Sequence, residues 1–281
     1  MSDRSATLDL DLSGIHVSLT GPDDGALEMF RVEWAAWLGS PADQPDLRME
    51  YRVSGEPPPD QTTLRKVLHT AHGDDSITFT TGEGKLELER SGHASATVTR
   101  GGDRFRFYGL QNLMLAALAR VLPGRGIMVV HGAGILLDGT AVALIGPEDA
   151  GKTTWARIAA ENGLTVLSDD LLFLGLDGEQ AFALGSPFRS ASTGPGRFPL
   201  GLLLSSEHAP EAAVRLCSRL AFQALLSANL PFSGDLIGKG TGLDRLLDGL
   251  LEAVPFRTLA FAPDPSFLDR IGESLARKFR E

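Results

Sequence analysis

The residues with the clearest chemical potential form a short glycine-containing loop in the second half of the chain. Residues 146–153 read G-P-E-D-A-G-K-T, which matches the phosphate-loop pattern G-x-x-x-x-G-K-[ST]. An apolar run, TAVALI, precedes this loop, and a helix-forming stretch, KTTWARIAAEN, follows it. Because the motif requires this strand-loop-helix context, the pattern predicts a loop that binds nucleotide phosphates.

Each part of this loop has a predicted role. Backbone N–H groups around Gly151 and at the start of the following helix would point at phosphate oxygens. The Lys152 ammonium would neutralise phosphate charge, and the Thr153 hydroxyl would ligate Mg²⁺. The predicted nucleotide-binding residues are Gly146, Pro147, Glu148, Asp149, Ala150, Gly151, Lys152, Thr153 and Thr154.

Two carboxylates stand inside the loop. Glu148 and Asp149 lie in a segment that has to hold a polyanion. If their side chains point outward, solvent screens their charge. If they point inward, they lower the affinity for nucleotide. The sequence leaves both orientations open.

A second acidic pair follows the next apolar strand. Asp169 and Asp170 come directly after Ser168, and an open α/β sheet places its ligands at the carboxyl ends of strands. One carboxylate could hold Mg²⁺, directly or through water, while the other accepts a proton from an attacking hydroxyl. The alternative interpretation is a solvated turn or a helix N-cap.

Five other side chains were candidates for chemistry. His131, on the strand before the loop, is flanked by small residues, so a ligand contact and a buried core histidine are both open. Arg189 is either a phosphate contact or an exposed arginine. His69 and His72 lack a third ligand, which favours a solvated or capping pair over a metal site. Cys217, the single cysteine, is expected to be a buried structural thiol.

The loop and the acidic pair need a scaffold, which the second half of the chain supplies. Apolar strands alternate there with helices, and this predicts an α/β sheet with both faces covered. The predicted strands are 127–137, 140–146, 164–176, 180–185, 200–206 and 256–262, and the predicted helices are 152–162, 211–228, one that ends at 252 and one that begins at 266.

The first half has a different pattern, in which short stretches alternate polar with apolar residues between turn signals. It predicts a smaller β-rich domain over 1–109, a connecting helix within 110–125 and the phosphate-loop domain over 126–281. The predicted strands are 6–12, 15–20, 47–53, 76–81, 85–91, 94–100 and 104–109, with one helix at 26–38.

Composition excludes several functional classes. The chain has 281 residues and a net charge of −10, which disfavours non-specific binding to nucleic acid or to an anionic membrane. The N-terminus lacks the pattern of a signal peptide, and no apolar run is long enough to span a membrane. We therefore expect a cytoplasmic protein with no membrane partner.

The ordered set HGAG, GPEDAGKT and LSDD resembles the C-terminal catalytic domain of the HPr kinase/phosphorylase family, and more closely its HPr-kinase-like serine kinase relatives. The fold of that family in turn is similar to ATP-dependent phosphoenolpyruvate carboxykinase. The resemblance covers residues 127–177 clearly and the rest of the second half more weakly. It departs at Glu148-Asp149, where the family has Ser-Gly, and in lacking the segment that contacts HPr.

The resemblance implies roles for the candidate residues. Lys152 and the loop backbone would bind ATP, and Thr153 would bind Mg²⁺ with Asp169 as a supporting group near the metal. Asp170 would be the catalytic base, and His131 would position the transferring phosphate. HPr itself is not the expected acceptor. The family forms hexamers, so a homo-oligomer is a possible assembly.

The sequence thus predicts an ATP-dependent kinase that transfers the γ-phosphoryl group to a hydroxyl, with serine of a small protein or precursor peptide as the expected acceptor. Two alternatives stay open. One is a catalytically degenerate nucleotide-binding module that recognises a peptide or protein partner. The other is a kinase that acts on a small metabolite.

Overall fold

The structure is a computed structural model that describes residues 4–56, 69–73, 75–188, 194–232 and 242–278. The chain divides into two compact units, Met1–Leu122 and Pro123–Glu281. Within the described residues it contains two sheets and six α-helices, a mixed α/β architecture. None of the helices described is both long and apolar enough to cross a membrane.

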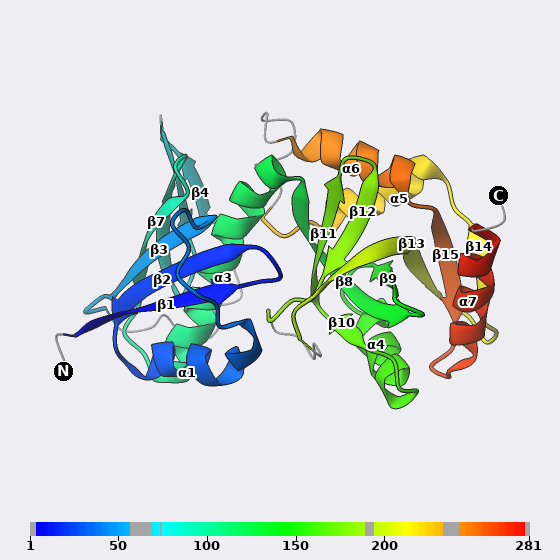
Figure 1. Cartoon of the computed structure of the whole chain (residues 1–281), viewed down its shortest axis with the longest axis horizontal. Helices are drawn as coiled ribbons and strands as arrows, with labels where there is room; N and C mark the ends of the chain where they lie inside the picture. Colours follow the sequence, from blue (N-terminus) through cyan, green and yellow to red (C-terminus); the bar gives the residue numbers. More distant parts are fainter. Residues whose placement is uncertain (1–3, 57–68, 74, 189–193, 233–241, 279–281) are drawn as a thin grey trace. The chain divides into compact units, whose positions relative to one another are not determined.

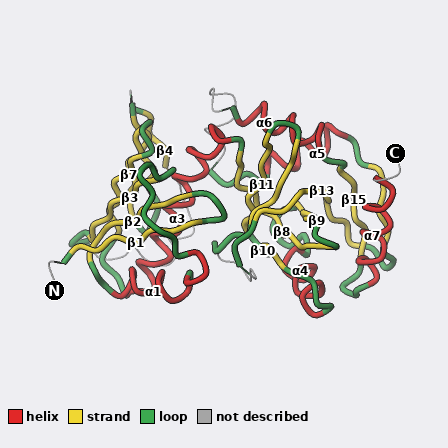
Figure 2. The backbone as a smooth tube through the Cα atoms, in the orientation of Figure 1, coloured by secondary structure: helices red, strands yellow, loops and turns green. Residues whose placement is uncertain are grey.

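The first unit is a sheet of seven strands in the order β1-β2-β3-β7-β6-β5-β4, with helices on one face (Figures 1 and 2). Alternate residues of β3 are buried and exposed, as expected for a sheet with one covered face. The strands are β1 (Ser5–Asp11), β2 (His16–Pro22), β3 (Leu47–Val53), β4 (His69–His72), β5 (Ser76–Thr80), β6 (Gly84–Glu89) and β7 (His93–Val98). The helices are α1 (Gly25–Glu33), the short 3-10 helix η1 (Ala35–Trp37) and α3 (Asp103–Val121).

Helix α3 corrects one prediction. Residues 104–109, expected as a strand, form its first turns, because Phe107 and Leu110 continue the helical spacing of buried side chains back to the Gly102 N-cap. The rest of α3, the predicted connecting helix, packs across β3, β6 and β7 of the first unit. Strand β4 was not predicted. It carries the H-x-x-H pair, of which His72 is exposed.

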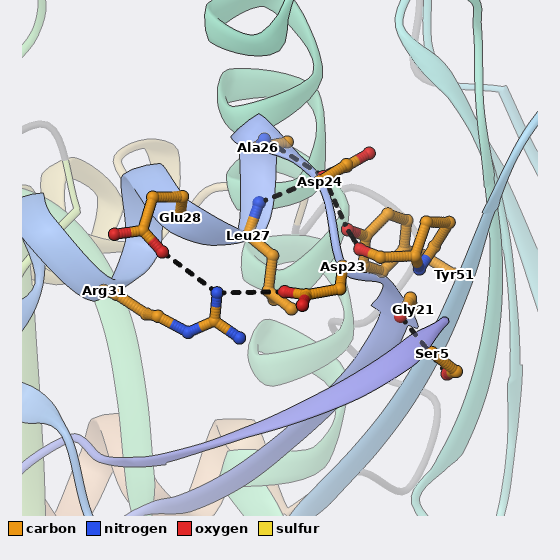
Figure 3. A network of polar contacts seen from close by, with 10 residues as sticks. Ser5, Gly21, Asp23, Asp24, Ala26, Leu27, Glu28, Arg31 and Tyr51 are labelled. Carbon is orange, nitrogen blue, oxygen red and sulfur yellow. Dashed lines mark hydrogen bonds and ion pairs between the residues drawn. The ribbon is translucent and has the colours of Figure 1, made fainter. Parts of the chain in front are cut away.

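A polar network joins the start of α1 to the sheet of the first unit (Figure 3). Asp24 Oδ1 accepts hydrogen bonds from the backbone N–H groups of Ala26 and Leu27, at 3.0 and 3.2 Å, and so caps α1. The Tyr51 hydroxyl lies 3.1 Å from the same oxygen, and Arg106 Nη2 lies 3.2 Å from Asp24 Oδ2. Burial, followed by the negative charge of Asp24, raises the pKa of Tyr51. One carboxylate therefore holds together a helix start, a strand and α3.

Replacing Asp24 with alanine is expected to lower the free energy of unfolding by about 1–3 kcal/mol, because it removes the cap and leaves partly buried donors without an acceptor. The neighbouring Asp23 pairs with Arg31 at the surface, where side chains are 45% and 32% exposed. Asp23→Ala is therefore the matched control, with an expected loss below about 1 kcal/mol. Urea denaturation of both variants checks the difference, and equal losses would contradict the role of Asp24.

The second unit is a mixed sheet in the order β10-β8-β11-β12-β13-β15-β14, with β9 pairing with both β8 and β13. Its strands are β8 (Ile127–Leu137), β9 (Thr140–Ile145), β10 (Val166–Ser168), β11 (Leu171–Asp177), β12 (Gln180–Leu184), β13 (Arg197–His208), β14 (Ala213–Leu216) and β15 (Phe256–Phe261). Its helices are the 3-10 helix η2 (Leu122–Arg125), α4 (Lys152–Glu161), α5 (Arg219–Ala228), α6 (Leu243–Ala253) and α7 (Ser266–Lys278).

Helices cover both faces of this sheet, as the sequence predicted (Figures 1 and 2). Strand β9 shows why, since Ala143 and Ile145 pack with α5 and α6, while Val142 and Leu144 pack with α4 and α7. Side chains point alternately to opposite faces of a strand, so a continuous apolar run fits only a sheet buried on both sides.

Two predictions for the second unit need correction. Residues 213–216, expected in a helix, form β14, because they pair antiparallel with β15, and only residues 219–228 are helical. Cys217 lies between these elements and is only partly buried, although a buried thiol was expected. The Asp138-Gly139 turn is confirmed, since φ values of 50° and 76° suit a two-residue hairpin loop.

Candidate phosphate-binding site

The predicted phosphate loop joins the end of β9 to the start of α4. Gly151 has a φ of 83°, a backbone conformation that favours glycine, and it forms the N-cap of α4. A Cβ at Gly146 would lie 2.7 Å from Ala150 Cβ, so glycine is required there for the loop to close on itself. The helix then continues because Trp155, Ala156 and other residues at helical spacing are buried against the sheet.

The first residue of α4 is Lys152, and its ammonium points back into the loop. Nζ donates hydrogen bonds to the carbonyl oxygens of Gly146, at 2.8 Å, and Pro147, at 2.6 Å. Among the described residues, no side chain caps the N-terminus of α4. The first N–H groups of a helix have no acceptor within the helix, and they carry the positive end of its dipole. Ammonium and helix start together favour an anion at this point.

The loop carboxylates are turned to solvent. Glu148 and Asp149 are both exposed, which answers the question of orientation that the sequence left open. Burial lowers the pKa of Lys152, while the negative charges of Asp170, Glu148 and Asp149 act in the opposite direction. The two loop carboxylates therefore help to keep the half-buried ammonium protonated.

This balance predicts how the binding of a polyphosphate anion at the loop depends on pH. We expect the affinity for such an anion to fall as pH rises through the lowered pKa of Lys152, because the neutral amine no longer attracts phosphate. Glu148→Gln combined with Asp149→Asn should move this fall to lower pH, since two charges that favour the ammonium are lost. Calorimetric titrations from neutral to alkaline pH test this, with Glu161→Gln on the same helix as control. An unshifted alkaline limb would contradict it.

The acidic pair lies between β10 and β11, which both pair antiparallel with β8. Ser168 stands opposite Gly134, and Leu171 stands opposite His131. The backbone N–H of Gly132 donates to Asp170 O at 2.9 Å. The pair directly follows Ser168, the last residue of β10, as the sequence predicted. The pair interrupts a strand that runs alongside β8. Before it, β10 pairs antiparallel with β8, and after it β11 does the same.

This arrangement brings three predicted residues together. His131 Nδ1 lies 3.7 Å from Asp170 Oδ1, with the two side chains 45% and 39% exposed. The negative charge of Asp170 also acts on the Lys152 ammonium, where it opposes the lowering of the pKa by burial. The Asp170 backbone N–H donates to the buried Ser168 hydroxyl oxygen at 3.2 Å, which helps to hold the turn. His131 of β8 and Asp170 of the segment between β10 and β11 thus lie together, and Asp170 acts electrostatically on Lys152 of α4.

Sequence reasoning missed the contribution of β13 and β15. These strands are parallel, and β9 is parallel to β13, so the carboxyl ends of all three meet at the loop. His208 Nε2 lies 3.4 Å from Asp149 O, and a Cβ at Gly151 would lie 3.3 Å from Phe261 Cζ. The signal available in the sequence was the polar SSEH that ends the apolar run of β13.

The remaining candidate residues lie at the start of α4 and next to Asp170. Thr153 is exposed in the first turn of α4, Thr154 is half-buried, and so is Asp169. The described residues contain no group of three or more His, Cys, Asp or Glu that could hold a metal ion by itself. This donor set still fits Mg²⁺, which proteins commonly hold with one or two carboxylates together with substrate phosphates and water. Arg189 lies outside the residues that the structure describes.

Comparison with known proteins adds little to this geometry. Neither a family model nor a curated protein matches the chain. A solved structure of the HPr(Ser) kinase/phosphatase from Coxiella burnetii is similar with a TM-score of 0.29 and 12% identity, over 54% of this chain and 96% of that chain. A TM-score this low does not establish a common fold, so any function assigned to the chain rests on its own site.

Proposed function

We propose that the second unit binds Mg²⁺-ATP at the phosphate loop and transfers its γ-phosphoryl group to a hydroxyl. The observation that carries this proposal is the convergence of Lys152, Asp170 and His131 beside a glycine loop at a helix N-terminus. The lysine and the helix start suit a polyphosphate, and the carboxylate suits proton transfer from a hydroxyl.

Lys152 would change partners when nucleotide binds. Its ammonium now donates to the carbonyl oxygens of Gly146 and Pro147, so phosphate oxygens would replace neutral acceptors by charged ones. The loop N–H groups would donate to the same phosphates. Thr153 and Asp169 would hold Mg²⁺, which supplies charge neutralisation at the β- and γ-phosphates when bound.

Asp170 would act as the base of the transfer. Its carboxylate accepts the proton of the acceptor hydroxyl as the hydroxyl oxygen bonds to the γ-phosphorus and the bond to the ADP oxygen breaks. Lys152 would stabilise the charge that develops on the phosphoryl oxygens. His131, beside Asp170, would position the transferring group.

Serine of a small protein or precursor peptide is the acceptor that we propose, and HPr is not. This choice rests on the resemblance of the HGAG, GPEDAGKT and LSDD segments to HPr-kinase-like serine kinases. An experiment could instead find a metabolite alcohol as the acceptor, or a partner that binds without phosphoryl transfer.

The test is calorimetry of the wild-type chain with Mg²⁺-ATP, followed by incubation with γ-labelled ATP and either serine peptides or small alcohols. Binding with label transferred to peptide serine supports the proposal. Transfer only to small alcohols would make the chain a metabolite kinase. Binding without transfer would point to a recognition module, and absence of binding would remove the nucleotide from the proposal altogether.

A further inference from the structure

A cavity of the second unit lies beside the middle of β13 and the amino end of β15, while the phosphate loop lies at the carboxyl ends of these strands. Its volume is about 630 Å³. The residues that matter in it are Val214 and Leu216 of β14, Arg257 of β15, and Arg270 and Glu273 of α7. We call this cavity the β14 groove.

One wall of the β14 groove is the edge of the sheet. Strand β14 ends the strand order and pairs, among the described strands, with β15 alone. Its last residue, Leu216, is 84% exposed. Edge strands in monomeric proteins are commonly protected by charges or covering loops, and an exposed leucine gives the end of β14 no such protection.

Arg257 supplies a charge at the same place. It stands opposite Leu216 in the β14–β15 pair, so the two side chains share one face of the sheet. That face carries α7, because Leu259, two residues further along β15, packs with Phe267 and Ile271. The leucine and the guanidinium therefore border the same groove.

Arg257 also lacks a counter-ion. It is half-buried, its Nη1 donates to the carbonyl oxygen of Phe256 at 2.8 Å, and no carboxylate among the described residues pairs with it. The neighbouring arginines are paired, Arg270 with Glu273 at 3.2 Å and Arg215 with Glu207 at 3.5 Å. A half-buried guanidinium without a counter-ion gains charge-assisted hydrogen bonds when a carboxylate reaches it.

We propose that the β14 groove binds an extended acidic peptide segment, which adds to β14 as a further strand. Backbone hydrogen bonds at the strand edge would give affinity, a carboxylate would pair with Arg257, and an apolar side chain would cover Leu216. The free strand edge favours a polypeptide over a small anion, because only a polypeptide can form the backbone hydrogen bonds of an added strand.

The probe is a fluorescein-labelled peptide of alternating valine and glutamate, and its matched control replaces each glutamate with lysine. Fluorescence anisotropy measures binding, and hydrogen exchange follows the amides of residues 213–216. We expect the acidic peptide alone to bind and to protect these amides. Arg257→Gln should weaken it about tenfold, the value of one charge-assisted hydrogen bond. Leu216→Gln should weaken it as well, and Arg245→Gln, at an exposed position on α6, should not.

Four results would overturn this assignment. They are equal binding of the lysine peptide, full affinity in Arg257→Gln, unprotected amides in β14, or displacement of the peptide by an equal concentration of inorganic phosphate. A dimer that Leu216→Gln dissolves and that excludes the peptide would make the edge a self-interface instead. None of these outcomes bears on phosphoryl transfer, so the two proposals stand or fall separately.

Discussion

Replacing Asp170 with asparagine is expected to lower phosphoryl transfer by about 10²- to 10⁴-fold, the range for loss of a general base, while Mg²⁺-ATP still binds. The amide keeps the size of the carboxylate but cannot accept the hydroxyl proton. We propose Asp170 as the base because it lies 3.7 Å from His131 and its charge acts on Lys152. Calorimetry and single-turnover transfer of labelled phosphate separate the two effects.

Two control variants make this result specific. Asp177→Asn removes an exposed carboxylate at the end of β11, where Asp177 pairs with Arg197 at 2.8 Å, and it should leave transfer unchanged. Asp169→Asn should weaken Mg²⁺ binding, so a higher Mg²⁺ concentration should restore part of its rate. The same increase should not rescue Asp170→Asn. Wild-type transfer in Asp170→Asn would exclude it as the base.

Replacing Lys152 with alanine is expected to weaken Mg²⁺-ATP binding about 10- to 100-fold, because one or more charge-assisted hydrogen bonds to phosphate are lost. Transfer should fall with binding, and further, since the ammonium also stabilises charge that develops during transfer. Two hydrogen bonds from Lys152 also hold Gly146 and Pro147 in the free loop. Equilibrium binding and transfer at saturating ATP measure these effects separately.

The matched control for Lys152 lies on the same helix. Arg157 pairs with Glu161, and both side chains are 58% exposed. Arg157→Ala therefore removes a cation from α4 without touching the loop, and its nucleotide affinity should equal that of the wild type. If Lys152→Ala binds as tightly as Arg157→Ala, the loop does not hold phosphate through its lysine, and the kinase proposal fails with it.

Local patterns predicted much of the framework. The strand 127–137 and the helix after the phosphate loop lie where the sequence placed them, because apolar spacing and turn residues act over a few neighbours. The helix ends at Glu161, just before the predicted stop at Gly163, whose φ is 81°. Residues 104–109 were predicted as a strand because polar and apolar residues alternate there. In the structure they form the first turns of α3, whose buried side chains include Phe107 and Leu110.

The sequence alone determined the phosphate-loop motif and its strand-loop-helix setting, because all its parts are contiguous in the chain. The tertiary structure decided what surrounds the loop. Pairing with β8 set the acidic pair in a break between two strands, and parallel pairing brought His208 to the loop. Pairing with β15 made β14 an edge strand. Such contacts join residues far apart in sequence. They depend on which strands pair in the sheet, and local sequence patterns do not specify this pairing.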